Sequence, residues 1–350
     1  MSDSPILHVL VPDLLAPLKL WNKDFGFEPK SETTATLLAH SQQKDVPFKG
    51  LDAAIFSLLG FSADDELPYA HFRVKKERIN SALVAHKGSF LCADPVHLKA
   101  GASEVILDAD PLSDLSENES TQYIELLNAH FSEDGLQFVK GCCNRWYLLL
   151  DRDESIRSTP LRELRNKEIS NYLPHSDNIN LHQLQNEAQM LLHSADVNFR
   201  REQDGKLAVN SLWLWGGGLQ TKARTRVRTV IGGGFGGELA ASVAQCRYLT
   251  TAAEPEQTLS QLDAGGHHLL ILDQLTPFAL NDDLEGWQEK LDKMEDEWFA
   301  PMATLFDKGK IKLLVQSCDG KVYIPEKKKS LNKLWNKVKG HKPSIMELLK

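Results

Sequence analysis

The chain alternates between short continuous apolar runs and longer stretches with apolar residues at helical spacing. The continuous runs predict buried strands at 6–11, 104–107, 146–150, 211–215, 226–231, 268–272 and 311–315. Helical spacing predicts helices at 119–131, 181–192 and 287–305, and the run at 53–59 fits either a helix or a strand. Because strands and helices alternate, the pattern predicts an α/β protein with a mostly parallel sheet.

Length and composition indicate a globular protein of about two domains. The chain has 350 residues, of which 42% are hydrophobic, and no apolar run reaches the roughly 18 residues of a membrane span. The first residues lack a signal-peptide pattern. The five cysteines are scattered and include no CxxC pair, so we expect reduced thiols in a cytoplasmic protein.

Charge is unevenly distributed along the chain. Residues 321–350 carry nine lysines and two glutamates, so the rest holds a large acidic excess within a net charge of −8. An acidic body argues against general nucleic-acid binding. Residues 327–339 place apolar side chains on one helical face among lysines, which predicts a basic amphipathic tail at 326–350. Such a tail would contact an anionic membrane or a protein partner, or remain solvated.

A glycine-rich segment, Gly232-Gly-Gly-Phe-Gly-Gly237, follows one predicted strand. The GxGxxG spacing fits either a phosphate cradle or a turn that permits tight strand–helix packing. A dinucleotide site also needs an acidic residue about 20 positions further on, at a strand end. Glu254 and Glu256 instead flank a proline, so the packing interpretation is favoured.

Two further segments carry candidate chemistry. Asp94 and His97, in Asp-Pro-Val-His, would serve as a general base or metal ligands, or form a structural turn. The second segment lies at 197–218. It consists of a helix end with Arg200 and Arg201, a predicted strand that begins near Asn210, and the glycine turn 216–218. We expect it to bind an anion, because arginine pairs with phosphate or carboxylate and ligands bind at the carboxyl ends of parallel strands. The alternative is that these arginines form surface ion pairs.

Several segments resemble the archaeal-type cofactor-independent phosphoglycerate mutases. Residues 196–218 resemble that family's Pro-Val-Asn-x-x-Arg helix end, Ala-Asn strand start and Gly-x-Gly turn. Residues 50–61 are similar to its Gly-Ser-Asp-x-Ala-His-x-Ser-x-Leu-Gly-Tyr segment, 145–150 to an Arg-Gly-apolar strand, and 287–294 to a helix. The strings Ala-Asp-Pro-Val-His-Leu and Asn-Ser-Leu-Trp-Leu-Trp-Gly-Gly-Gly resemble more closely the bacterial mutase-like regulatory proteins of the Rpf pathogenicity-factor group.

The resemblance implies an alkaline-phosphatase-like fold, with a three-layer α/β core, a mostly parallel sheet and a smaller inserted α+β domain. We expect core segments at 1–90 and 181–325, the inserted domain at 91–180 and the tail at 326–350. The family's chemistry uses a serine nucleophile and two manganese or zinc ions. Here the serine position falls on Leu51, and the metal-binding segments fall on 278–282 and near 318–319. Only Asp13, Asp282 and Asp319 remain as candidate metal ligands, so we expect no cofactor.

The expected function is therefore that of a catalytically degenerate mutase-like protein with a regulatory or sensor role. It would bind a small phosphorylated or carboxylate ligand, or a protein partner. The expected anion ligands are Arg145, Asn198, Arg200, Arg201, Asn210, Gly216, Gly217 and Gly218. Arg201→Ala should then remove ligand binding with little loss of stability. Deletion of 326–350 should likewise have little effect on stability. The alternatives are an enzyme that uses Asp94 and His97, and a scaffold that acts through its tail.

Overall fold

The chain forms two compact units. The computed structural model describes residues 4–39, 41–62, 66–77, 88–101, 104–108, 112–151, 154, 156–218, 222–251, 255–327 and 343–349. One unit combines Met1–Ala63 with Ala223–Lys350, and the inserted unit is Asp64–Lys222. The insertion therefore begins earlier and ends later than the expected 91–180. Most of the predicted amphipathic tail lies outside the described residues.

The first unit is built on a seven-stranded sheet of order β12-β11-β13-β1-β14-β15-β2. Its strands are β1 Ile6–Leu10, β2 Ser41–Asp45, β11 Val227–Gly232, β12 Arg247–Leu249, β13 His267–Ile271, β14 Lys312–Gln316 and β15 Lys321–Pro325. The five strands from β12 to β14 pair in parallel, and β15 is antiparallel to both of its neighbours. This confirms the α/β class and the mostly parallel sheet.

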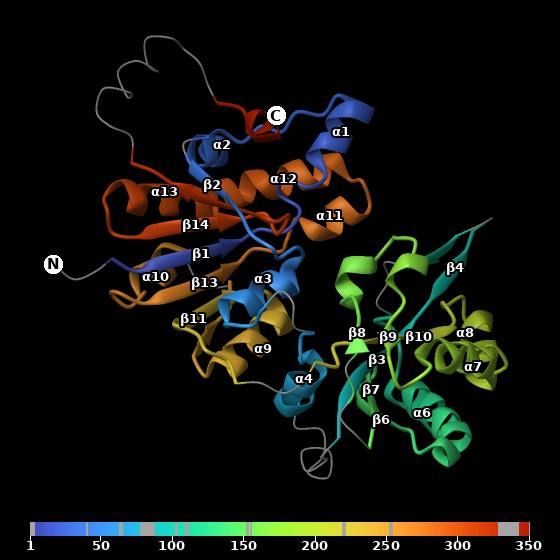
Figure 1. The fold of residues 1–350 in the computed structure, drawn as a ribbon. Coiled ribbons are helices and arrows are strands. Elements are labelled where there is room, and N and C mark those ends of the chain that lie inside the picture. The colour runs from blue at the N-terminus through green and yellow to red at the C-terminus, as the bar shows by residue number, and fades with distance from the viewer. Residues whose placement is uncertain are drawn as a thin grey trace. The chain divides into compact units, whose positions relative to one another are not determined.

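Helices cover both faces of this sheet (Figure 1). They are α1 Leu18–Phe25, α2 Glu32–Ala39, α3 Leu51–Leu58, α9 Gly234–Ala244, α10 Pro255–Ser260, α11 Thr276–Leu280, α12 Leu284–Met294 and α13 Ala300–Asp307, with a π-helical turn, η4, at Glu295–Phe299. On one face α2, α12 and α13 bury Leu7, Val9 and Val315 of the central strands. α3 and α9 lie on the other. The last described segment, the 3₁₀ turn η5 (Ile345–Leu349), packs into the same core.

The glycines at the junction of β11 and α9 allow the strand and the helix to approach closely. Gly232 and Gly233 have φ of +74° and +72°. A Cβ on Gly237 would lie 1.9 Å from the carbonyl oxygen of Gly232, which is far inside van der Waals contact. The segment's geometry therefore supports the packing interpretation of GxGxxG.

The inserted unit has a four-stranded antiparallel sheet of order β10-β3-β7-β6. Its elements are α4 Tyr69–Glu77, β3 Phe90–Val96, β4 Leu98–Ala100, β5 Val105–Leu107, α6 Glu117–Phe131, η1 Ser132–Asp134, β6 Gln137–Cys142, β7 Arg145–Leu149, β8 Ile156–Arg157, η2 Leu161–Leu164, η3 Ser170–Tyr172, β9 His175–Ser176, α7 Leu181–His193, α8 Asp196–Gln203 and β10 Ser211–Trp215. α6 and α7 pack on one face of the sheet, and α4 packs against β3 on the other.

This packing explains the corrected boundaries. α7, α8 and β10 were assigned to the core by position, but α7 contacts β10, and β10 pairs with β3 in the inserted sheet. Their apolar residues complete the core of that unit. Among the described residues, no helix is both long and apolar enough to cross a membrane.

Candidate functional site

The glycine turn after β10 is crowded by protein atoms. β10 is antiparallel to β3, so the rule about carboxyl ends of parallel strands does not apply to it. Gly216 has φ of +70°, and a Cβ there would lie 2.9 Å from Tyr69 Cβ. A Cβ on Gly218 would lie 1.9 Å from the carbonyl oxygen of Glu66, and Gly217 is similarly enclosed. Gly216 and Gly218 therefore permit the start of α4 and the residues before it to pack closely against this turn, and Gly217 lies against Leu91 of β3.

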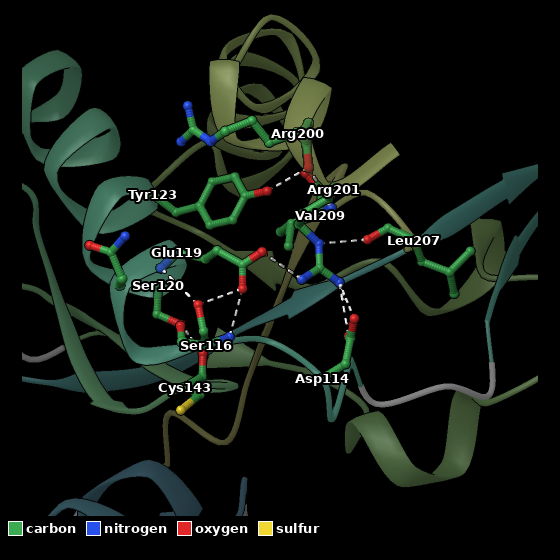
Figure 2. A network of polar contacts seen from close by, with 12 residues as sticks. Asp114, Ser116, Glu119, Ser120, Tyr123, Cys143, Arg200, Arg201, Leu207 and Val209 are labelled. Carbon is green, nitrogen blue, oxygen red and sulfur yellow. Dashed lines mark hydrogen bonds and ion pairs between the residues drawn. The ribbon is translucent and has the colours of Figure 1, made fainter. Parts of the chain in front are cut away.

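Arg201 is the centre of a buried polar network (Figure 2). Its Nη2 donates to Asp114 at 2.9 and 3.1 Å, its Nη1 donates to Glu119 at 3.1 Å, and its Nε donates to the carbonyl of Leu207 at 2.8 Å. The side chain is 0% exposed. Burial opposes the charged form, but the hydrogen bonds to the two carboxylates outweigh it and raise the pKa of Arg201. The expectation that Arg201 is a surface arginine is therefore wrong.

The two predicted asparagines are also fully engaged. The Asn198 side chain accepts from the Tyr123 hydroxyl at 2.5 Å and the Val209 amide at 2.9 Å, and it donates to two backbone carbonyls at 2.7 and 2.8 Å. Asn210 accepts from the amide of Leu98 at 2.7 Å and donates to its carbonyl at 2.8 Å. Both amides thus join segments of the inserted unit.

The remaining predicted arginines lie apart from each other. Arg200 is exposed at the end of α8, where its Nη2 donates to Gln122 at 2.5 Å. Arg145, at the start of β7, pairs through Nε with Glu77 of α4. The arginines, asparagines and glycines that were predicted to hold an anion therefore belong to separate structural contacts.

Asp94 belongs to a buried network that the sequence interpretation missed. It lies inside strand β3, and its carboxylate accepts from Arg73 at 2.6 and 2.9 Å and from the Trp215 indole at 2.9 Å. Arg73 Nε also donates to the Tyr147 hydroxyl at 2.9 Å, which donates to Glu77 at 2.6 Å. Arg73 and Glu77 stand four positions apart, on one face of α4, and this spacing was the available signal.

His97 has a different partner from Asp94. Its Nδ1 lies 2.8 Å from the carbonyl oxygen of Ala208, so Nδ1 carries the proton and donates it. Asp94 is held by Arg73 and Trp215. The structure does not show the shared dyad that the Asp-Pro-Val-His string suggested.

The three candidate metal ligands accept hydrogen bonds within the first unit. Asp13 accepts from the Thr276 hydroxyl at 2.7 Å, and Asp282 accepts from the Trp21 indole at 2.7 Å. Asp319 accepts from a backbone amide two residues further on, at 3.2 Å. Within the described ranges, no three His, Cys, Asp or Glu side chains are grouped so that they could hold a metal ion.

Leu51 occupies the first position of α3 and is 3% exposed. The preceding Gly50 has φ of +86°, and its amide donates to the carbonyl of Cys318, just after β14, at 2.8 Å. An aliphatic side chain thus stands where the resemblance places a serine nucleophile. It has no atom that can accept a phosphoryl group.

A basic edge, defined by Arg226, Arg228 and His267, lies at the amino ends of β11 and β13. These residues help line a cavity of about 470 Å³. Both arginines are exposed, and neither makes an ion pair or a side-chain hydrogen bond with any described residue. Partial burial and the neighbouring Arg226 lower the pKa of His267. The pattern Arg-x-Arg-x-Arg, which begins at Arg224, was the sequence signal for this cationic surface.

Comparison with known proteins points to one enzyme group. A segment of 182 residues is 29% identical to the 2,3-bisphosphoglycerate-independent phosphoglycerate mutase of Methanosarcina barkeri, covering 49% of this chain and 43% of that enzyme. A probable enzyme of the same name from Geobacter sulfurreducens is 27% identical over 126 residues, 35% of this chain and 31% of its own. The chain is a distant relative of these mutases. It spans less than half the length of these relatives, and no family model matches it.

One solved structure shares the fold over most of the chain. The PH0037 protein from Pyrococcus horikoshii superposes with a TM-score of 0.51 at 10% identity, covering 93% of this chain and 88% of that one. At this identity the likeness concerns the fold alone.

Proposed function

We propose that this chain is a non-catalytic relative of the phosphoglycerate mutases that binds a small phosphorylated or carboxylate anion in a regulatory role. The observation that carries the proposal is the aliphatic Leu51 at the start of α3. Phosphoryl transfer through an enzyme intermediate needs a nucleophile activated by a base or a metal. The regulatory part of the proposal follows the resemblance to the Rpf-group proteins.

The basic edge is the site that we propose for the anion. Arg226 and Arg228 take the anion-binding role that the sequence analysis gave to Arg145, Arg200 and Arg201. Their guanidinium groups make no ion pair with a described carboxylate. Guanidinium groups bind phosphate and carboxylate with two parallel hydrogen bonds. The name of the related mutases contains a phosphoglycerate, an anion that carries both groups.

An activity assay tests the first half of the proposal. Purified protein with manganese should not interconvert 2- and 3-phosphoglycerate. Leu51→Ser should not restore the reaction, because no group of His, Cys, Asp or Glu side chains among the described residues could hold the metal ions. Turnover that co-elutes with the protein and exceeds a buffer control would contradict it.

Calorimetric titration with 3-phosphoglycerate tests the second half. Wild type should bind, and the double variant Arg226→Gln/Arg228→Gln should weaken binding at least tenfold, a loss of about 1.4 kcal/mol. Arg200→Gln is the matched control, because Arg200 is equally exposed but lies in the other unit. If Arg200→Gln removes binding and the double variant does not, the anion site is the one first expected from sequence. If wild type binds no anion at millimolar concentration, the sensor role fails.

A further inference from the structure

The basic edge contains an imidazole as well as two guanidinium groups. His267 begins β13 and lines the same cavity of about 470 Å³ as Arg226 and Arg228. The register between β11 and β13 shifts between Val227 and Thr229, so Arg228 is the extra residue of a β-bulge. A bulge changes the direction of nearby side chains. Two neighbouring strands thus contribute a pair of guanidinium groups and an imidazole to one cavity.

The His267 ring is held by the buried His8 of β1. Nδ1 of His267 lies 3.0 Å from Nε2 of His8, and the two rings stack with their centroids 5.3 Å apart. His267 itself is partly exposed, and its Nε2 makes no hydrogen bond with a described residue. The ring therefore contacts the protein through one nitrogen, and no described residue competes with a ligand for the other.

The hydrogen bond between the two rings decides which nitrogen of His267 carries its proton, because one of the facing nitrogens must donate and the other must accept. If His267 donated, the proton of a neutral His8 would lie on Nδ1, which is buried and has no partner among the described residues. If His8 donates, its Nδ1 is a bare acceptor, and buried groups of that kind are tolerated better than an orphaned N–H. His267 then accepts at Nδ1 and carries its proton on Nε2.

The charge of the basic edge matches a phosphate monoester. Burial lowers the pKa of His8 to about 4, and burial together with Arg226 lowers the pKa of His267, so both rings are neutral at pH 8. Arg226 and Arg228 supply two positive charges. A phosphate monoester has three terminal oxygens and nearly two negative charges at this pH, because its second pKa is about 6. A carboxylate offers only two oxygens and one charge.

We propose that the basic edge binds the phosphoryl group of a phosphate monoester, with the Nε2–H of His267 as a third donor beside Arg226 and Arg228. His8 is a positioning residue, because its hydrogen bond selects the tautomer of His267. The inference rests on the proposed anion-binding function of the basic edge. It adds the chemical class of the anion and two residues that act on it.

Calorimetric titration of the full chain at pH 8 tests the donor role of His267. Wild type should bind glycerol 3-phosphate, which carries only the phosphate, about tenfold more tightly than glycerate, which carries only the carboxylate. His267→Leu should weaken binding of glycerol 3-phosphate about tenfold, because a hydrogen bond to a charged group is lost. His267→Gln keeps an N–H donor and should bind more tightly than His267→Leu. Equal affinity of His267→Leu and wild type, equal affinity of the two variants, or a preference for glycerate would overturn the inference.

The arginine variant separates this inference from the proposed function. If Arg226→Gln/Arg228→Gln loses glycerol 3-phosphate while His267→Leu binds it as tightly as wild type, the basic edge binds the anion without His267, and only the present inference is overturned. If wild type binds neither glycerol 3-phosphate nor 3-phosphoglycerate at millimolar concentration, the basic edge is not an anion site, and both proposals are overturned.

NMR spectroscopy tests the role of His8 without any variant of His267, and it decides the outcome if His267→Leu does not fold. Long-range ¹H–¹⁵N spectra of the full chain, labelled with ¹⁵N at histidine, distinguish a protonated ring nitrogen from a bare one. At pH 8 the proton of His267 should lie on Nε2, and glycerol 3-phosphate should shift that resonance saturably but leave His193 of the inserted unit unchanged. His8→Leu should add a population of the Nδ1–H tautomer. A proton on Nδ1 of His267 in wild type, no shift with the phosphate, or an unchanged tautomer in His8→Leu would overturn the inference.

Discussion

Arg201 illustrates how buried polar residues in this protein are held. Each of its three guanidinium nitrogens has a partner, two of them carboxylates, and the side chain is 0% exposed. Asn198 is similarly satisfied by four hydrogen bonds. Leaving such groups unpaired in the interior would cost more than each bond contributes. Residues of this kind therefore stabilise the fold of the inserted unit.

Replacement of Arg201 by alanine should be strongly destabilising. We expect Arg201→Ala to lower the free energy of unfolding by about 2–4 kcal/mol, because it removes a buried side chain and strands Asp114 and Glu119. Arg200→Ala, at the exposed neighbour, should change it by less than about 0.5 kcal/mol. Urea denaturation of the two variants provides the comparison. Equal effects would show that Arg201 is not a structural residue.

Asp94 and Arg73 form the second buried charge pair. Their side chains are 4% and 3% exposed. Asp94→Asn should cost about 3–5 kcal/mol, because removing one charge leaves the other buried without compensation. Lys99→Ala breaks a pair whose lysine is 59% exposed, and it should cost about 1 kcal/mol or less. Chemical denaturation again gives the measurement, and similar losses for the two variants would contradict the assignment.

At the scale of elements, the predicted helix at 287–305 is divided. The structure has α12, the π-helical turn η4 and α13 in its place. The wider i→i+5 turn of η4 accompanies the burial of Trp298 and Phe299. Glu295, at the start of the turn, accepts from the backbone amides of Thr33 and Thr34 at 3.3 and 2.6 Å, and so caps the amino end of α2.

The turn η5 makes the end of the chain part of the first unit's core. Ile345 is 0% exposed and packs in the cluster formed by the sheet and its helices. The expectation that residues 326–350 bury little apolar area is therefore wrong for the last described residues. Ile345→Ala should lower the free energy of unfolding by about 2–5 kcal/mol. Glu347→Ala, at an exposed position of the same turn, is the control, and a similar stability for both variants would refute the prediction.

At the scale of the whole molecule, the first unit is assembled from the two ends of the chain. β1 pairs with β13 and β14, across more than 250 residues of intervening sequence. His8 is a buried residue of β1, and its Nε2 lies 3.0 Å from Nδ1 of His267. Burial, with smaller contributions from His267 and His268, lowers the pKa of His8 to about 4.

This shift makes the stability of the protein dependent on pH. The folded state keeps His8 neutral until about pH 4, whereas the unfolded state binds the proton near the ordinary value of 6.5. The stabilisation is thus complete above pH 6.5 and is lost as the pH falls toward 4, by about 3 kcal/mol in total. His8→Leu should flatten the dependence of unfolding free energy on pH in this window. His193→Leu, at an exposed site, should not, and an unchanged slope for His8→Leu would exclude His8 as the cause.

The sequence by itself determined several of the local elements and the fold class. The strand predicted at 211–215 is β10 with the same limits, and the helix at 181–192 is α7 within one residue. The prediction of α7 succeeds because burial of one helical face imposes a period on neighbouring residues. The prediction of β10 succeeds because burial of both faces of a strand requires a continuous apolar run.

Only the tertiary structure decided the direction of strand pairing and the partners of the polar residues. β10 has the same apolar run whether it pairs parallel or antiparallel. The pattern therefore could not exclude the antiparallel sheet, to which the parallel-strand argument for an anion site does not apply. Asn210 meets Leu98 across 112 positions, and Arg201 meets Asp114 across 87. Whether such a side chain binds a ligand or its own chain depends on which distant segment folds against it. The local pattern of apolar residues does not indicate which segment that is.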